Sequence, residues 1–320
     1  MNDHRTTTAV SDASACWPAL PLEAWKDTRD TLHMLTQIVG KVRLELTPKV
    51  NHWWNVTLHV SARGLTTGMI PYGERVFEME FDFIEHKLAI RSSEPQTRAI
   101  ALTPRPVADF YREFTSVLHE LGIDVSIWKM PVEVADAIPF DQDTVHRAYD
   151  PEYARRFWRV LASVDEVFKV FRSRFIGKSS PSQFFWGSFD HAVTRFSGRK
   201  APPRNEADPV LRRIMAEAYS HEVISAGWWP GAGEVKDAAF YCYAVPQPAG
   251  FEKQTVLPQS AFYHSGLGEY VLMYDEVRKA KSPSEMLLDF LESTYQASAI
   301  TGKWDRAALE REPEPAAGAA

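Results

Sequence analysis

The sequence has few cysteines and no arrangement of them that could form a disulfide framework or a paired metal site. Cys16 and Cys242 are the only two, and they lie far apart in the chain. Proteins without disulfide bonds are typical of reducing compartments, so we expect a cytoplasmic protein. No apolar run approaches the roughly 20 residues that a membrane-spanning helix needs. The N-terminus also lacks the apolar core of a signal peptide.

Positive charge is not in excess, and motifs with a defined chemistry are missing. The net charge of -6 argues against a general nucleic-acid binder and against docking on an anionic membrane surface. The chain contains no GxSxG, no HExxH and no GxxxxGK[ST] motif. No single motif therefore assigns a reaction.

The chain has enough residues for two domains of ordinary size and enough apolar side chains for a large core. It is 320 residues long, of which 45% are hydrophobic and 12% are aromatic. Aromatic rings suit a core, and they equally suit the walls of a binding pocket.

One motif, W-x4-H-x3-R, occurs twice, and the second copy begins 132 residues after the first. The copies are Trp54, His59 and Arg63, and Trp186, His191 and Arg195. The elements expected around both copies follow the same order of helix, strands and closing helix. The repeat predicts an α+β fold of two similar helix–antiparallel sheet–helix units, an internal duplication with a cleft between the units.

The expected organisation has five parts. They are a disordered leader (1–15), a first α+β unit (16–128), a linker (129–150), a second unit (151–304) with an insertion at 199–238, and a disordered tail (305–320). Hydrophobic periodicity places helices at 22–39 and 152–171, and a short helix is expected at 208–218. A cap residue followed by proline predicts a helix at 104–121, and a capping box predicts another that begins at 282. Strands are expected at 41–46, 53–63, 77–83, 87–91, 183–195, 222–226, 239–245, 261–264 and 269–274.

Four segments carry a resemblance to a known family. They are NHWWNVTLHVSARGLTTGMIPYG, FFWGSFDHAVTRFSGR, AYSHEVISAGWWPG and AFYHSGLGEYVLMYDEVR. Together they resemble a bacterial family of unknown function, family 5996, over about Trp17 to Trp304. The resemblance implies no established activity, so the chemistry has to be argued from the residues.

Two arginines are candidate anchors for an anionic ligand. Alternate residues of a strand share a face, which puts His59 with Arg63 and His191 with Arg195. A guanidinium binds carboxylate or phosphate with two hydrogen bonds. The alternative interpretation is a solvated sheet face stabilised by cross-strand pairs.

Histidines near carboxylates are candidates for proton transfer or for metal binding. The catalytic candidates are His59, His221, Glu222 and His264. The metal candidates are His52, His221 and His264, which would suit a divalent transition metal such as Zn²⁺ or Fe²⁺. No HxH or HxxxH spacing supports a metal site, so ordinary structural histidines are the alternative.

Aromatic and basic residues complete the candidate site. Trp53, Trp186 and Trp228 are expected to wall the cleft, and Lys178 belongs to the densest basic region of the chain. The alternatives are that the tryptophans pack in the core and that the basic residues form a solvated surface.

We therefore expect an enzyme, metal-dependent or acid–base, that acts on a small anionic or aromatic metabolite in an Arg/His/Trp-lined cleft. The alternatives are a non-catalytic small-molecule binding or sensing protein, and a protein-interaction scaffold. An enzyme should direct a buried histidine or carboxylate into the cleft, whereas a binding protein needs no such group. A scaffold should instead expose an apolar patch.

Overall fold

The computed structural model describes residues 16–203 and 207–312, and it contains two antiparallel sheets. The strand order of the first sheet is β1-β2-β4-β5-β6, and β3 pairs with β4. Its strands are β1 (His59–Val60), β2 (Gly64–Thr66), β3 (Ile70–Tyr72), β4 (Arg75–Asp82), β5 (Lys87–Ser92) and β6 (Thr97–Ala101). The predicted hairpin at 77–91 is confirmed as β4 and β5.

The second sheet is the larger one, with the strand order β11-β12-β10-β9-β8-β7. Its strands are β7 (Gln183–Phe185), β8 (Asp190–Lys200), β9 (His221–Trp229), β10 (Ala239–Val245), β11 (Phe262–His264) and β12 (Glu269–Met273). β9 lies at the centre and pairs with β8 on one side and β10 on the other. The strand predicted at 222–226 is confirmed as part of β9.

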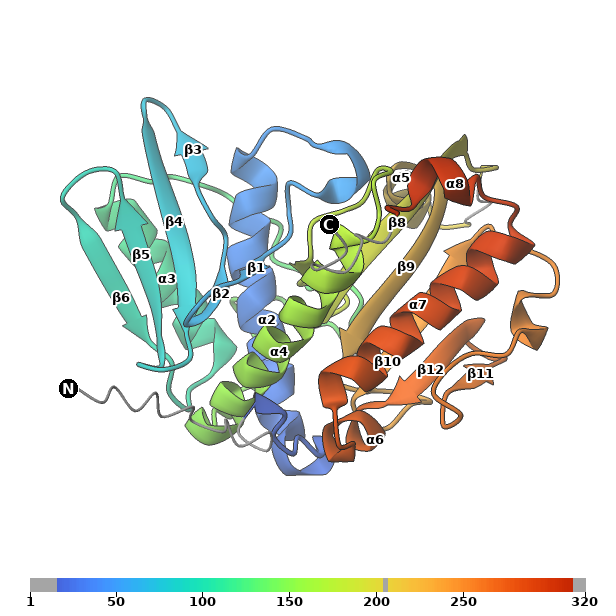
Figure 1. Cartoon of the computed structure of the whole chain (residues 1–320). Helices are drawn as coiled ribbons and strands as arrows, with labels where there is room; N and C mark the ends of the chain where they lie inside the picture. The colour runs from blue at the N-terminus through green and yellow to red at the C-terminus, as the bar shows by residue number, and fades with distance from the viewer. Residues whose placement is uncertain (1–15, 204–206, 313–320) are drawn as a thin grey trace, which may run out of the picture.

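Helices separate and cover the two sheets. They are α2 (Leu22–Leu46), α3 (Val107–Glu120), α4 (Pro151–Ser173), α5 (Pro209–Ala218), α6 (Tyr274–Lys279), α7 (Pro283–Thr301) and α8 (Arg306–Leu309), with short 3-10 turns η1 (Asn51–Trp53) and η2 (Phe251–Lys253). Figure 1 shows α4 and α7 lying across one face of the second sheet and α2 running between the sheets. None of the helices in the described ranges is long and apolar enough to cross a membrane.

The two faces of the second sheet have different surroundings. Along β8, His191 and Arg195 contact side chains of α4 and α7. Asp190, Ala192 and Thr194 alternate with them and line a cleft on the opposite face. The helix-covered face is a packed core, and the other face is open to a ligand.

Aromatic rings fill the core beneath α4. Phe157 of α4 stacks on Phe189 at 5.3 Å and contacts Phe184 and Trp228 at 6.0 Å between ring centroids. Each of these four side chains is at most 2% exposed. Such pairs contribute about 0.5–1.5 kcal/mol each beyond the area they bury, so α4 is firmly attached to the sheet.

The strand predicted at 41–46 is wrong, because α2 continues through it to Leu46. Ile38 and Val42 are one helical turn apart and both buried. The alternation of Val42, Leu44 and Leu46 is typical of a strand, but the packing of α2 against the core keeps these residues helical.

The long strands predicted at 53–63 and 183–195 are each interrupted by a turn. His52 and Trp53 have φ values of 57° and 61°, in the left-handed region that a strand cannot accommodate. Phe189 has a φ of 58° in the turn between β7 and β8. Only β1 and the β7–β8 hairpin remain of the two predicted strands.

The chain ends are partly ordered. α8 occupies 306–309, and Glu310 bridges to Phe175, which corrects the predicted disorder of the tail as far as residue 312. The rest of the predicted tail and the leader 1–15 lie outside the described residues.

The structure does not confirm the internal duplication. Trp54 ends η1 and His59 lies in the two-residue strand β1, whereas Trp186 lies in a turn and His191 in the eleven-residue strand β8. The two copies of the motif therefore have different local structures. The coarser prediction, an α+β protein with two antiparallel sheets, is confirmed.

Candidate functional site

A cleft with a volume of about 1240 Å³ covers the free face of the second sheet. Helix α2, η1, α5 and the segment 128–133 complete its lining. Its aromatic lining residues are Trp53, Trp54, Trp128, Phe185, Trp186, Phe196, Tyr219, Trp229, Phe240, Tyr241 and Tyr243. A concave lining rich in aromatic residues is typical of a small-molecule site, and the volume of this cleft exceeds the usual range of about 300–1,000 Å³.

A glycine on the sheet face makes room for the ring of Tyr241. Gly227 stands between Ala192 and Tyr241 in the register of β8, β9 and β10. A Cβ on Gly227 would come within 2.2 Å of the Tyr241 Oη, so only glycine lets this ring lie across β9. The Tyr241 hydroxyl then donates a hydrogen bond to Asp190 on β8.

Three carboxyl groups form what we term the acidic floor of the cleft: Glu133, Asp190 and Glu269. Burial, with the charge of Asp190 as a second cause, raises the pKa of Glu133 and of Glu269 to about 7. Burial also raises the pKa of Asp190, although Ser188 and Tyr241 donate hydrogen bonds to its carboxylate. With pKa values of about 7, Glu133 and Glu269 would both give and take protons near neutral pH.

Glu133 occupies a strained position that the surrounding structure fixes. Its φ is 56°, which costs a residue other than glycine about 1–3 kcal/mol and is frequent at functional sites. The preceding Val132 exchanges two hydrogen bonds with the Gln37 side chain of α2, at 2.8 and 2.9 Å. Although the Glu133 side chain is exposed, its backbone is therefore held in place.

A second polar group, formed by His52 and Lys178, adjoins the cleft. The Lys178 Nζ lies 2.7 Å from the His52 Nε2, and the His52 Nδ1 lies 3.1 Å from the Ala218 carbonyl oxygen. Because an ammonium can only donate, Nε2 accepts and Nδ1–H donates to Ala218, which describes a neutral imidazole. Burial and the charge of Lys178 are among the causes that lower the pKa of His52.

Four of the predicted site residues line the cleft or contact its lining. Trp53 and Trp186 line it, and their indole N–H groups donate to backbone carbonyls of Ile214 and Val56. His52 lines it as well. Lys178 lies beside His52, with its ammonium 5.3 Å from the ring centroid of Trp54.

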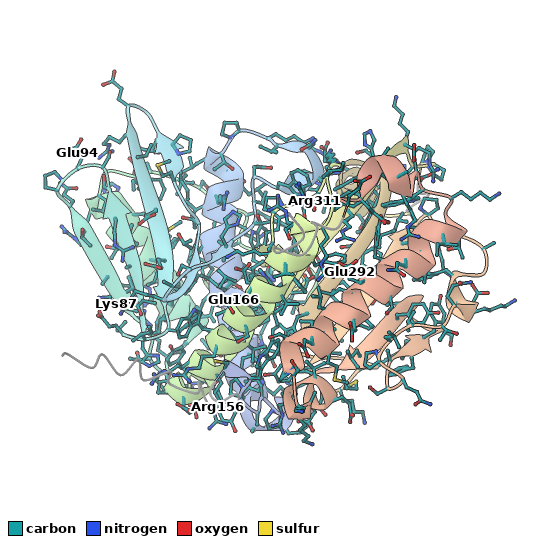
Figure 2. The ribbon with its side chains drawn as sticks, viewed as in Figure 1. Lys87, Glu94, Arg156, Glu166, Glu292 and Arg311 are labelled. Carbon is teal, nitrogen blue, oxygen red and sulfur yellow. The ribbon has the colours of Figure 1, made fainter. Side chains whose placement is uncertain are left out.

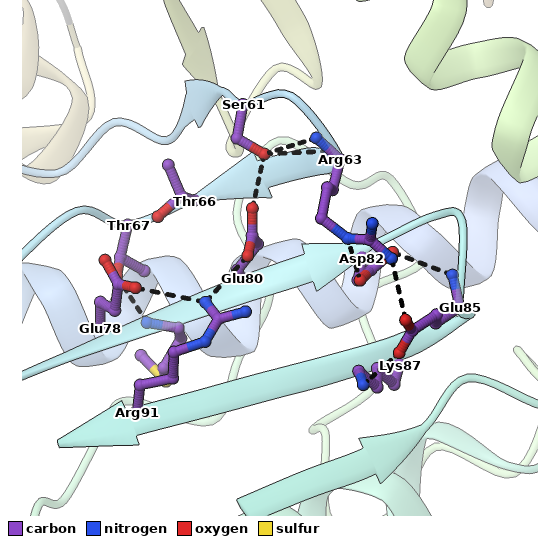
Figure 3. A network of polar contacts seen from close by, with 12 residues as sticks. Ser61, Arg63, Thr66, Thr67, Glu78, Glu80, Asp82, Glu85, Lys87 and Arg91 are labelled. Atoms are coloured by element: carbon purple, nitrogen blue, oxygen red, sulfur yellow. Dashed lines mark hydrogen bonds and ion pairs between the residues drawn. The ribbon is translucent and has the colours of Figure 1, made fainter. Parts of the chain in front are cut away.

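Arg63 lies in an ion-pair network on the first sheet instead of in the cleft. It pairs with Asp82 at 2.6 Å and with Glu85 at 3.1 Å, as Figure 3 shows. Burial raises the pKa of Asp82, but the hydrogen bond from Arg63 and two backbone N–H bonds outweigh it and lower the pKa overall. Arg63 thus neutralises the carboxylate of Asp82.

Arg195 lies on the helix-covered face of β8 and is 1% exposed. Its guanidinium lies 3.4 Å from the ring centroid of Phe171 and 4.3 Å from that of Tyr295. The nearest carboxylate is Glu292 of α7, at 3.6 Å, which Figure 2 labels. Because this guanidinium is enclosed between α4 and α7, it does not anchor a ligand in the cleft.

Four further candidates do not line the cleft. Trp228 is fully buried against α4, and its neighbour Trp229 lines the cleft instead. His59 is half-buried on β1, and burial lowers its pKa to about 4. Glu222 pairs with Arg199 at 2.6 Å. His264 contacts the Leu267 backbone N–H at 3.2 Å.

The structure does not bring the three predicted metal ligands together. The rings of His52 and His221 are 6.0 Å apart. His264 ends β11, three strand spacings from β9, which is about 14 Å at the usual separation. Within the described ranges, no three His, Cys, Asp or Glu residues form a group that could hold a metal ion.

Sequence reasoning missed the acidic floor. The cleft was predicted on the face of β8 that carries His191 and Arg195, whereas it lies on the opposite face, which carries Asp190. Glu133 and Glu269 are isolated acidic residues in the sequence, and only the tertiary fold brings them near Asp190. Alternation along β8 was the one signal that could have identified Asp190.

Comparison with known proteins places the chain in a family. No curated protein and no solved structure matches it. The model of the family of unknown function DUF5996 matches residues 17–311, nearly the whole chain, so the chain belongs to this family.

Proposed function

We propose that the chain is an enzyme that binds a small aromatic ligand in the cleft and uses the acidic floor for general acid–base catalysis. The observation that carries the proposal is the position of Glu133, Asp190 and Glu269 inside an aromatic cleft. Burial holds the pKa of both glutamates at about 7, the range in which a carboxyl group both gives and takes protons at neutral pH.

The buried carboxyl group favours an enzyme over a passive binding protein. Asp190 is 7% exposed, yet it lines the cleft. Burying a carboxyl group lowers stability unless it is fully paired, and a binding protein has no need to keep such groups protonated. Perturbed carboxyl groups in a cleft are typical of catalytic sites.

The lining also indicates the kind of ligand. Tryptophan and tyrosine rings contact planar molecules through their faces, and carboxylates attract a cation or an N–H donor. The anionic ligand expected from Arg63 and Arg195 loses both anchors, because neither arginine lines the cleft. We propose an aromatic compound with a basic nitrogen as the ligand.

The two free cysteines support the cytoplasm as the compartment of the protein.

Three probes of matched size test the binding part: phenethylamine, phenethyl alcohol and hydrocinnamate. Tryptophan fluorescence reports binding, because five tryptophans line the cleft. We expect the cation to bind about tenfold tighter than the alcohol, which is about 1.4 kcal/mol. Asp190→Asn and Glu269→Gln should each reduce this preference, whereas Asp109→Asn on exposed α3 should not. Equal or absent binding of all three probes overturns the proposal.

Catalysis is tested by incubating the purified protein with a metabolite extract in heavy water. Mass spectrometry should reveal at least one aromatic compound that is consumed or gains deuterium, and Glu269→Gln should suppress the change. If the phenyl probes bind but no metabolite changes, the chain is a binding protein and the catalytic part is wrong.

A further inference from the structure

Lys41 is a buried lysine of α2 that lines the cleft. The residue is 3% exposed. Its ammonium nitrogen lies 4.6 Å from the ring centroid of Trp128, 5.8 Å from that of Phe140 and 6.0 Å from that of Trp186. Trp128 and Trp186 line the cleft too, so the amine is enclosed by rings that a ligand would contact.

The Lys41 amine lacks a polar partner in the described part of the chain. No hydrogen-bond acceptor and no carboxylate lies within bonding distance, and Glu45 one turn along α2 acts only through its charge. Other lysines differ: Lys26 pairs with Asp30 at 2.7 Å, and Lys178 contacts His52 at the same distance. Because burying an unpaired ammonium is unfavourable, this position has the signature of a functional amine rather than of a structural one.

The surroundings favour the neutral amine. Burial lowers the pKa of Lys41 to about 8, although the charge of Glu45 partly opposes the shift. At about pH 7.5 its neutral fraction exceeds that of an ordinary lysine by on the order of 100-fold. A neutral amine carries the lone pair that a nucleophile requires, and buried lysines serve as Schiff-base residues for this reason.

We propose that Lys41 is a nucleophile that forms an imine with an aldehyde or ketone group of an aromatic ligand in the cleft. This inference rests on the proposed function of the same cleft, and it adds a carbonyl compound to the ligand class. The geometry supports this proposal independently of the pKa, because Lys41 is buried, has no polar partner and lies among the aromatic rings of the lining.

The chemistry balances without a further reagent. The Nζ lone pair attacks the carbonyl carbon, the carbon–oxygen π pair takes up a proton, and the nitrogen loses one, which gives a carbinolamine. Protonation of its hydroxyl lets water leave as the nitrogen lone pair forms the C=N bond, which gives an iminium ion. Loss of the remaining N–H proton then gives the imine and returns the proton. The net change is amine plus carbonyl to imine plus water, and the acidic floor lies in the same cleft as a source of protons.

Reductive trapping tests the inference. The full-length protein is incubated with phenylacetaldehyde and cyanoborohydride at about pH 7.5, and the modified lysines are mapped by peptide mass spectrometry. We expect Lys41 to be labelled roughly tenfold or more faster than exposed Lys26, because of its larger neutral fraction. Lys41→Arg should abolish fast labelling. Phenethyl alcohol, which fills the cleft without a carbonyl, should slow it. Uniform labelling of surface lysines, or fast labelling at Lys178 alone, overturns the inference.

A second variant separates this inference from the proposed function. Lys41→Met keeps an apolar side chain of similar length, and folding is checked by circular dichroism. If phenethylamine still binds the wild type but Lys41 is not trapped, the imine is wrong and the proposed function stands. If hydrocinnamate binds the wild type at least about tenfold tighter than Lys41→Met and no imine forms, Lys41 is an anion anchor and the imine is again wrong.

Discussion

At the scale of single residues, Glu269 should make the stability of the protein depend on pH. Its folded pKa of about 7 lies above the unfolded value of 4.5, because of burial and the charge of Asp190. The contribution of the protonated Glu269 to the free energy of unfolding is complete below about pH 4.5 and is lost as the pH rises through 7. We expect Glu269→Gln to be more stable than the wild type at pH 8, by about 1–3 kcal/mol, and equal to it near pH 4.5.

Urea unfolding at both pH values checks this prediction. Glu94→Gln is the matched control, because Glu94 is exposed in the turn after β5 (Figure 2). A Glu269→Gln variant that is less stable than the wild type at pH 8 would show that its ionised carboxylate is paired.

Lys41 should have the opposite dependence on pH. Its folded pKa of about 8 lies below the unfolded value of 10.5, because burial disfavours the charged form. The cost of the buried charge is complete below about pH 8 and is relieved as the pH rises towards 10.5. Lys41→Met should therefore gain about 1–3 kcal/mol at pH 7 in thermal or urea unfolding, with the gain shrinking above pH 8. A loss of stability at pH 7 would instead mean that the contact with Trp128 outweighs the burial cost.

At the scale of elements, Gly227 controls the acidic floor through the packing of β9 against β10. A Cβ at this position overlaps the Tyr241 Oη, so Gly227→Ala should displace the ring and break its hydrogen bond to Asp190. We expect a loss of about 1–3 kcal/mol of stability and weaker binding of phenethylamine.

The double variant with Tyr241→Phe tests whether the effect passes through the hydroxyl group. Tyr241→Phe removes the hydrogen bond and leaves the ring in place. If Gly227→Ala acts by breaking that bond, the two losses should not add. Full additivity would mean that backbone distortion of β9, not the Tyr241–Asp190 bond, explains the effect.

Local sequence patterns predicted the elements in which the spacing of apolar residues agrees with the face that is buried. The alternation in β4 and β5 identified their hairpin, the helical spacing identified α4, and the residues that cap the helix identified the start of α7. The same rules failed at Lys41–Leu46, where a strand-like alternation lies inside a helix. They failed again at His52 and Trp53, because neither residue type indicates the left-handed backbone conformation that both adopt.

Local patterns also left the face of each strand undecided. Alternation separated Arg195 from Asp190 correctly, and it separated Trp228 from Trp229. It could not say which face α4 and α7 would cover, because the packing of a helix on a sheet is a tertiary contact that alternation along one strand does not specify. The polar character of Arg195 favoured the wrong face, since its guanidinium is in fact stabilised by the rings of Phe171 and Tyr295.

At the scale of the whole molecule, the cleft is a product of tertiary folding. Lys41 comes from α2, Glu133 from the segment before α4, Asp190 from β8 and Glu269 from β12. No spacing in the sequence connects these four residues. The aromatic character of the cleft was predictable from Trp53 and Trp186, whereas its acidic floor was not.

The most direct test of the account is the number of protons released when phenethylamine binds. Calorimetry at about pH 6.5 in two buffers of different ionisation enthalpy measures this number. A cation on the acidic floor should lower the pKa values of Glu133 and Glu269, so we predict release of about 0.3–1 proton per chain. The Glu269→Gln variant should release fewer protons when it binds phenethylamine. Binding without proton release would contradict the claim that the acidic floor receives the ligand's charged group.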